Sequence, residues 1–372
     1  MKTKIMIFIY SLSGGGAERT IVNLINNLNK KKFEVVLVLG TTNNSDYIDL
    51  IDDKIKLIIL NSKKLRYSLL KLRNCIIKEK PDILFSTINA NNIILLLARL
   101  LIFKNIPTIV RESNNRTQSG SVTLLNKLIT NLLYNYVASK VIALSKGVKE
   151  DLVNNFFIKE NKIKVIYNPV EVEKIKQLSK QKLNGFNKNN NEKLIISVGR
   201  LVEQKDYPTL IKAFSILEKK VSSRLIILGK GPLEKKLKKI CKDYGLEEKV
   251  QFVGFKNNPY KFMRAADLFV LSSKWEGFGH VIVESMAVGT PVISTDCKSG
   301  PSEIIGKNEY GKLVSVGNAE ELSKNIISLL ENPTLLDFYS KQGIKRANDF
   351  DAKTITEQYE KVFYSIIKDK NK

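Results

Sequence analysis

Short apolar runs alternate with helix-like segments along most of the chain, and this alternation limits the fold more than any other feature. Runs such as 56–60, 83–86 and 140–143 are each followed by a segment whose apolar residues recur at helical spacing. The alternation predicts an α/β fold with parallel sheets covered by helices on both faces. A chain of 372 residues exceeds the usual size of one domain, so two such domains are expected. Ligands of these sheets bind beyond the carboxyl ends of the strands.

Lysine and arginine are in excess, 61 against 37 aspartate and glutamate, which gives a net charge of +24. Most of the excess lies in residues 1–185, which carry 30 cations and 14 anions. Three interpretations compete: nucleic-acid binding, attraction to an anionic membrane or substrate, and compositional bias. No nucleic-acid-binding motif accompanies the charge, so no nucleic-acid partner is predicted.

Three widely spaced cysteines, Cys75, Cys241 and Cys297, form no C-x-x-C pattern. This favours a reducing, cytoplasmic location. The longest apolar segment, 93–103, is interrupted by Arg99 and is shorter than the roughly 20 residues that span a bilayer. We therefore expect no transmembrane segment.

No metal site is predicted. The chain has a single histidine, His280, which excludes a site built from several histidines. The sequence Asp349-Phe350-Asp351 fits a D-x-D metal pattern but directly precedes the last predicted helix. We interpret it as part of a helix cap.

The most informative stretch is Glu276-Gly277-Phe278-Gly279-His280-Val281, which continues to Glu284. It connects an apolar run to a helical pattern, so it predicts a tight turn that opens a helix. Unpaired backbone N–H groups at a helix start suit an anion, whereas the flanking carboxylates suit hydroxyl groups. The stretch therefore predicts a ligand that carries both phosphate and hydroxyls. His280 is either a neutral donor to that ligand or a packing residue.

A second candidate loop follows the predicted strand 193–198. It begins at Gly199 and contains Arg200 and Lys205. A planar guanidinium and a mobile ammonium together suit two linked phosphates.

In the first half, glycines 14–16 lie between the first strand and helix, where backbone can approach a phosphate. Gly15 and Gly16 are the candidates there. Asn89 and Glu112 each follow a predicted strand and are candidates for binding an acceptor hydroxyl. For Glu112, the alternative is a loop carboxylate without a role.

The segment 122–136 predicts a helix whose apolar stripe includes Leu124, Leu125, Leu128 and Leu132. Such a stripe is usually buried in the core. The alternative is a partly exposed helix that docks on a membrane.

Two glutamates separated by seven residues around Gly-Phe-Gly resemble the signature of glycosyltransferase family 4, whose members are retaining enzymes of the GT-B architecture. The segments Ser13-Gly-Gly-Gly-Ala-Glu-Arg19 and 294–304 resemble the bacterial members that build lipopolysaccharide, capsule or lipid-linked oligosaccharides. The resemblance covers nearly the whole chain. Many relatives carry a histidine in the first domain, and this chain has none there.

The resemblance implies two Rossmann-like domains whose sheets face an interdomain cleft. The expected boundaries are an acceptor-binding domain at 1–170, a linker at 171–192, a nucleotide-sugar domain at 193–350, and a C-terminal helix at 351–372 that packs back on the first domain.

The resemblance also implies the roles. Arg200 and Lys205 would neutralise the donor diphosphate in place of a divalent metal, Glu276 would hold the sugar, and Glu284 would hold the ribose. Gly254-Phe255 resembles the base-binding segment. The reaction would move a hexose or N-acetylhexosamine, with UDP-sugar as the expected donor and no cofactor, to a glycan or lipid-linked glycan. The basic first domain could associate with the inner face of the cytoplasmic membrane.

Two alternatives remain. One is a sugar-nucleotide epimerase on the same architecture, which would need acid and base groups at the sugar. The other is a noncatalytic, polysaccharide-binding protein of GT-B type.

Overall fold

The computed structural model describes residues 2–13, 15–43, 45–118, 120, 122–183 and 192–370. Within them the chain divides into two compact units. The first unit runs to Pro169 and resumes at Ala352, and the second comprises Val170–Asp351. Gly14 of the predicted glycine loop and residues 184–191 of the predicted linker lie outside the described residues.

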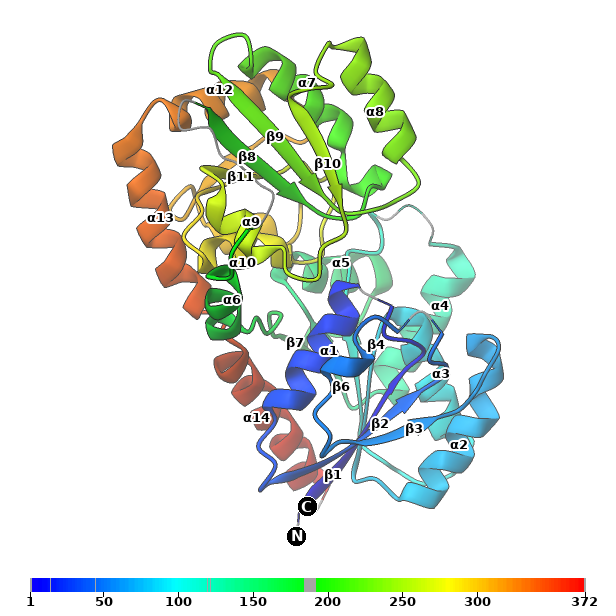
Figure 1. The fold of residues 1–372 in the computed structure, drawn as a ribbon. Helices are drawn as coiled ribbons and strands as arrows, with labels where there is room; N and C mark the ends of the chain where they lie inside the picture. The colour runs from blue at the N-terminus through cyan, green and yellow to red at the C-terminus, as the bar shows by residue number, and fades with distance from the viewer. Residues whose placement is uncertain are drawn as a thin grey trace. The chain divides into compact units, whose positions relative to one another are not determined.

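In its described residues, the first unit contains a parallel sheet in the order β3-β2-β1-β4-β5-β6-β7 (Figure 1). Its strands are β1 Thr3–Ile9, β2 Phe33–Leu39, β3 Lys56–Ile59, β4 Ile83–Thr87, β5 Thr108–Glu112, β6 Lys140–Ala143 and β7 Ile163–Val165. Its α-helices are α1 Gly16–Asn27, α2 Ser68–Glu79, α3 Asn89–Leu100, α4 Leu124–Leu132, α5 Lys146–Phe156 and α14 Ala352–Lys370. Short 3-10 turns are η1 Ile48–Leu50, η2 Leu65–Tyr67 and η4 Glu160–Lys162, and η3 Leu133–Val137 is a π-helical turn that continues α4.

Alternate residues of β1 are buried in two different cores because both faces of the sheet are covered. Ile5, Ile7 and Ile9 belong to the cluster that includes residues of α1 and α14. Met6 and Phe8 belong to the cluster that includes residues of α2 and α3. Burial on both faces explains why the strand reads as a continuous apolar run.

The C-terminal helix α14 packs on the first unit, as predicted (Figure 1). Tyr359 and Phe363 pack edge-on against Phe85 of β4, with ring centroids 6.0 and 5.9 Å apart. The buried Arg111 donates from Nε to the Tyr359 hydroxyl at 3.2 Å. The aromatic rings and this hydrogen bond anchor the helix to the sheet.

The second unit contains a parallel sheet in the order β10-β9-β8-β11-β12-β13 among its described residues. Its strands are β8 Lys193–Val198, β9 Ser223–Leu228, β10 Val250–Gly254, β11 Leu268–Leu271, β12 Val292–Thr295 and β13 Lys312–Val314. Its helices are α6 Val172–Ser179, η5 Glu203–Lys205, α7 Tyr207–Leu217, α8 Glu234–Asp243, α9 Tyr260–Ala265, α10 His280–Ala287, α11 Pro301–Ile305, α12 Ala319–Leu330 and α13 Pro333–Asn348. The predicted α/β class with two parallel sheets is confirmed.

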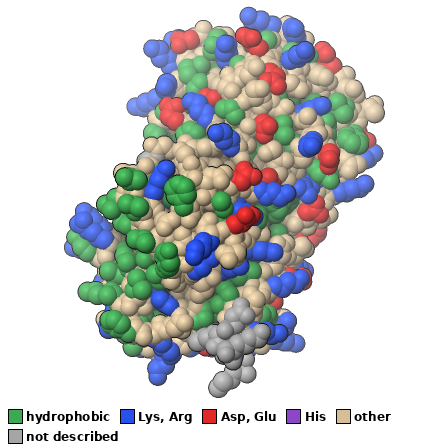
Figure 2. Space-filling model, turned by 180° about the vertical axis from the view of Figure 1, so that it is seen from behind, with side chains coloured by type: hydrophobic (Ala, Val, Ile, Leu, Met, Phe, Trp, Pro, Cys, Tyr) green, Lys and Arg blue, Asp and Glu red, His purple; other side chains and the backbone are tan. Residues whose placement is uncertain are grey.

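Two local predictions are wrong. The segment 171–192, read as a polar linker, contains α6, which belongs to the second unit and is tied to it by a hydrogen bond from Asn258 to the Leu178 carbonyl, 2.9 Å. Of the two interpretations of the leucine stripe of α4, burial in the core is wrong, and the stripe is exposed as the alternative supposed (Figure 2). No helix of the described residues is both long and apolar enough to cross a bilayer.

Close backbone contacts join the loops that follow β8, β9 and β10. The Gly199 amide donates to the Leu228 carbonyl at 2.9 Å, and the Gly229 amide donates to the Gly254 carbonyl at 3.0 Å. Gly229 has φ +145°, and a Cβ there would lie 1.9 Å from the Gly199 carbonyl oxygen. Only glycine fits between these loops.

We therefore expect Gly229→Ala to lower the free energy of unfolding by more than about 2 kcal/mol, because backbone must move to admit the methyl group. Gly245→Ala is the matched control, since Gly245 also has a positive φ but a Cβ there meets nothing within 4 Å. It should cost only about 1 kcal/mol of conformational strain. Urea unfolding of both variants tests this, and equal losses would contradict the proposed contact.

Candidate active site

The candidate residues of the second unit lie around its two central strands. β8 and β11 are neighbours, but the chain leaves β8 toward β9 on one side and leaves β11 toward β12 on the other. This reversal is the topological switch point, where open α/β sheets bind ligands beyond the strand carboxyl ends. Arg200 and Lys205 come from the loop after β8, and Glu276 comes from the loop after β11.

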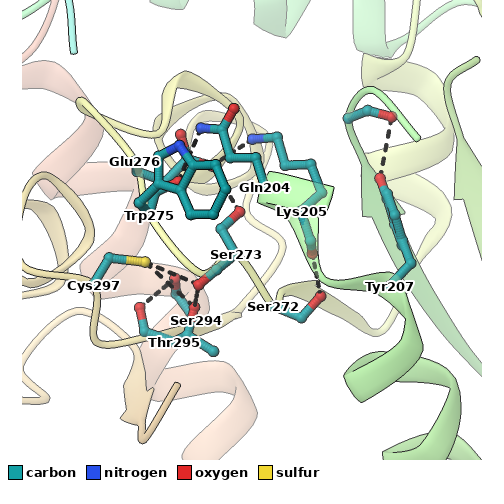
Figure 3. Close-up of polar contacts among 11 residues, drawn as sticks. Gln204, Lys205, Tyr207, Ser272, Ser273, Trp275, Glu276, Ser294, Thr295 and Cys297 are labelled. Carbon is teal, nitrogen blue, oxygen red and sulfur yellow. Dashed lines mark hydrogen bonds and ion pairs between the residues drawn. The ribbon is translucent and has the colours of Figure 1, made fainter. Parts of the chain in front are cut away.

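Lys205 and Glu276 form an ion pair across this point, 71 residues apart in sequence (Figure 3). Their side chains are 15% and 8% exposed. A pair with so little solvent exposure is strongly coupled, and removal of either partner leaves a partly buried charge without compensation. Both residues were predicted from the sequence as site residues, but their direct contact was not predicted.

A serine, a threonine and a buried thiol fix the carboxylate side of the pair. Ser273 donates from Oγ to Glu276 Oε1 at 2.7 Å. The Ser273 carbonyl in turn accepts hydrogen bonds from Thr295 Oγ1 at 2.6 Å and Cys297 Sγ at 3.0 Å (Figure 3). Burial raises the pKa of the Cys297 thiol to about 12, so this thiol stays protonated and donates.

The lysine side of the pair is held by hydrogen bonds to the loop after β11. The Ser272 hydroxyl donates to the Lys205 carbonyl at 2.8 Å, and Gln204 Nε2 donates to the Trp275 carbonyl at 2.9 Å. These bonds join the loop after β8 to the loop after β11 (Figure 3). Tyr207 donates its hydroxyl to the Gly199 carbonyl at 3.1 Å, and burial raises its pKa above the ordinary value, so the phenol remains a donor.

Arg200 is exposed in the same loop as Lys205. Within the described residues its guanidinium has no ion pair, in contrast to Lys205. It can therefore meet an anionic ligand without first breaking a salt bridge.

The predicted turn opens helix α10, with Gly279 at the N-cap in a left-handed conformation, φ +95°. Gly277 and Phe278 are buried, and the His280 ring packs edge-on against Phe278 with centroids 5.6 Å apart. Val281 is half-buried in the first turn. Backbone N–H groups at such a helix start can hold a phosphate oxygen.

Glu284 lies further along α10 and is 4% exposed. The carboxylate is therefore mostly enclosed by protein rather than facing solvent. At the end of β10, Gly254 has φ +75° and Phe255 is 49% exposed. Lys230, from the loop after β9, lies with Nζ 5.2 Å from the Phe255 ring centroid. An exposed ring beside a cation could stack on a flat ligand group.

The candidates of the first unit also flank a switch point, between β1 and β4. Gly15 is the N-cap of α1 and Gly16 is its first residue, directly after the β1 loop. Asn89 is the first residue of α3 after β4, and the preceding Ile88 has φ +72°, an unusual conformation for a β-branched residue.

Glu112 is the last residue of β5 rather than a loop residue, and it is 2% exposed. Its Oε1 accepts hydrogen bonds from the Tyr134 hydroxyl, from Asn92 Nδ2 at 3.3 Å and from Asn89 Nδ2 at 3.4 Å. Burial raises the pKa of Glu112, and Arg116 and the hydrogen bonds oppose that shift. Asn89 is half-buried and joins this cluster to the surface.

Sequence reasoning missed Ser273, Gln204, Thr295 and Gly229. Serine, threonine and glutamine are common in loops, so their identity gives no signal until the strands that bring them together are known. Gly229 belongs to a Gly-Lys-Gly segment directly after a predicted strand, and that position was an available signal. The described residues contain no group of three or more His, Cys, Asp or Glu side chains placed to hold a metal ion.

Two family models match the chain, one over each half. Residues 14–174 match "Glycosyltransferase Family 4" and residues 179–346 match "Glycosyl transferases group 1". A Campylobacter jejuni protein named N-acetylgalactosamine-N,N'-diacetylbacillosaminyl-diphospho-undecaprenol 4-alpha-N-acetylgalactosaminyltransferase is 35% identical over 365 residues, which covers 94% of this chain and 96% of that protein. The chain belongs to the family 4 glycosyltransferases.

A second relative and a solved structure are also similar to this glycosyltransferase over most of its length. The lipopolysaccharide core biosynthesis glycosyltransferase LpsE of Rhizobium meliloti is 26% identical over 93% of this chain and 94% of its own. A crystal structure of Anabaena Alr3699/HepE in complex with UDP and glucose matches with a TM-score of 0.82 over 98% of this chain and 100% of that one. Identity to that structure is 22%, so it shows the shared fold alone.

The buried Glu112 of this glycosyltransferase predicts a pH dependence of stability. Because its pKa is raised in the folded state, the folded protein binds more protons than the unfolded chain above pH 4.5, the ordinary value. The contribution of Glu112 to stability therefore falls as pH rises from 4.5 toward the folded pKa. Glu112→Gln should become progressively more stable relative to wild type over that window, as measured by urea unfolding at several pH values.

Glu150→Gln, at an exposed carboxylate of the same unit, is the matched control. A stability difference between Glu112→Gln and wild type that does not change with pH would contradict the assigned environment.

Proposed function

We propose that this glycosyltransferase moves a hexose or N-acetylhexosamine from a nucleoside diphosphate, with UDP-sugar as the donor, to a hydroxyl of a growing cell-surface glycan. We propose further that the sugar keeps its anomeric configuration and that no divalent metal is needed. The observation that carries the proposal is the Lys205–Glu276 ion pair beside the exposed Arg200 at the switch point of the second unit.

The charges of the site residues indicate which part of the donor each of them would bind. The diphosphate gains negative charge as it leaves, and preorganised cations and N–H groups lower the barrier to that step. Arg200, Lys205 and the first amides of α10 would meet the diphosphate. Glu276 would accept hydrogen bonds from sugar hydroxyls and stabilise positive charge at the anomeric carbon.

The ion pair supports this assignment because its two members would bind different parts of one ligand. Lys205 would bind the diphosphate, and Glu276 would bind the sugar. In the absence of donor, Glu276 compensates the charge of Lys205. A diphosphate offers Lys205 a more highly charged partner, and Glu276 then turns its free oxygens to the sugar. Glu284 would hold the ribose, and Gly254 and Phe255 would contact the base.

Names of relatives support the class of donor sugar and acceptor. The Campylobacter relative is named an N-acetylgalactosaminyltransferase that acts on a diphospho-undecaprenol carrier. We therefore propose an N-acetylhexosamine donor before a hexose one, and an acceptor glycan carried on a lipid at the inner face of the cytoplasmic membrane. Asn89 and Glu112 would help to shape the acceptor side of the first unit.

The test is hydrolysis and transfer from a panel of uridine and guanosine diphosphate sugars with EDTA present. We expect one uridine donor to be turned over in EDTA. Arg200→Ala and Glu276→Ala should each lower turnover by on the order of 100-fold or more, because each removes a charge that stabilises the transition state.

Glu203→Ala is the matched control: this glutamate lies in the same loop but its side chain is 60% exposed and pairs weakly at 3.8 Å with Lys236. It should keep nearly full turnover. Loss of activity in EDTA that Mg²⁺ restores would overturn the metal-independent mechanism, and absence of turnover with every donor would overturn the proposed function.

A further inference from the structure

One large aromatic residue at the candidate active site, Trp275, is only half-buried. It is the single tryptophan of the chain, and it lies in the loop after β11, bonded directly to Glu276. Tryptophan is usually mostly buried in folded proteins because its ring is large and apolar. Partial exposure at the carboxyl edge of the sheet, where this fold binds ligands, therefore points to a partner that covers the ring.

The backbone of Trp275 is tied to the loop after β8. Its carbonyl accepts the hydrogen bond from Gln204 Nε2 at 2.9 Å, and the amide of the preceding Lys274 donates to the Gln204 carbonyl at 2.8 Å. The next residue is fixed through its carboxylate, which contacts Ser273 and Lys205. The indole is therefore carried by a loop that is held in place on both sides of it.

The indole has both a ring face and an N–H group to offer a ligand. Within the described parts of the chain its Nε1–H donates no hydrogen bond, and this nitrogen is not among the buried polar atoms that lack a partner, so solvent reaches it. No aromatic ring or cation of those residues stacks on the indole, whereas Phe255 lies beside Lys230. In the view of Figure 3 the indole lies in front of the contact between Lys205 and Glu276.

These two groups match the sugar of a nucleoside diphosphate sugar. The face of an aromatic ring carries partial negative charge, so it attracts C–H groups, whose hydrogens are slightly positive. A pyranose ring has such C–H groups on its faces and hydroxyl oxygens at its rim, and those oxygens can accept a hydrogen bond from the indole N–H. A diphosphate has no apolar face and would gain nothing from the ring. Uracil is flat and could stack on it, which makes the base the competing occupant.

We propose that Trp275 is the platform on which the donor sugar lies. Glu276 and Trp275 would then bind the same sugar, the first through its hydroxyl groups and the second through its C–H face. This inference rests on the proposed function, which puts the sugar at Glu276. It adds a residue that recognises the sugar rather than the nucleotide. Because sugars differ in how many C–H groups share one face, Trp275 would contribute to the choice between donor sugars.

The first test uses the fluorescence of Trp275, which reports on this position alone because the chain has no other tryptophan. The probes are UDP, UDP-glucose, UDP-N-acetylglucosamine and UDP-N-acetylgalactosamine, and calorimetry measures the binding of each in parallel. For every UDP-sugar that binds, we expect a shift in emission and protection of the indole from quenching by acrylamide, since the sugar covers the ring. Saturating UDP should leave both signals nearly unchanged.

The second test measures the affinity of variants by calorimetry. Trp275→Ala should bind a UDP-sugar about tenfold more weakly than wild type while its affinity for UDP is unchanged, because only the contact with the sugar is lost. Trp275→Phe keeps an aromatic face and should recover most of this loss. Tyr244→Ala is the matched control: this ring is 46% exposed at the end of α8 and lies in none of the candidate loops. It should bind every probe as wild type does.

The outcomes separate this inference from the proposed function. An indole that responds to UDP as strongly as to a UDP-sugar would assign the ring to the base and overturn the platform. The platform is also wrong if Trp275→Ala binds UDP-sugars as tightly as wild type, or loses affinity for UDP and UDP-sugars by the same factor. Each of these results leaves the transferase proposal standing. If no UDP-sugar binds to wild type, the proposed donor is wrong and the platform with it.

Discussion

The ion pair between Lys205 and Glu276 can form because the sheet of the second unit places two loops side by side. Each residue lies in a loop at the carboxyl end of one of two central strands, β8 and β11, and the loops are tied to each other through Gln204 and Ser272. The two strands are neighbours in the sheet, and the direction in which the chain winds through the sheet reverses between them. A cation and a carboxylate are thus brought together at the one edge position where this type of sheet leaves room for a ligand.

The same principle organises the first unit with different chemistry. Its switch point lies between β1 and β4, and the residues there are glycines at the start of α1 and Asn89 at the start of α3. Behind Asn89 lies a buried cluster in which Glu112 accepts three hydrogen bonds. Thr130 of α4 and Tyr134 of η3 complete this cluster, so the opposite, leucine-bearing face of α4 points outward. The exposed apolar surface therefore follows from the polar interior.

Much of the fold could be predicted from the sequence, because strands buried on both faces are continuous apolar runs. Strands β6 and β8 have the predicted bounds. The site residues could be named from their places after strands, but the pairing of Lys205 with Glu276 could not, because it depends on which strands are neighbours. The burial of the α4 stripe was predicted wrongly because periodicity identifies an apolar face without indicating what covers it. Helix α6 was missed because its sequence is polar and short, and helix α13 was not predicted at all.

The most direct test of the central claim is calorimetric binding of uridine diphosphate to wild type, Lys205→Ala and Glu276→Gln. If the pair divides the donor between diphosphate and sugar, Lys205→Ala should weaken binding about tenfold or more, since it removes a cation from the diphosphate. Glu276→Gln should bind uridine diphosphate at least as tightly as wild type, because Lys205 no longer has to leave a carboxylate. Equal weakening in both variants would contradict the claim and would make the pair a structural contact alone.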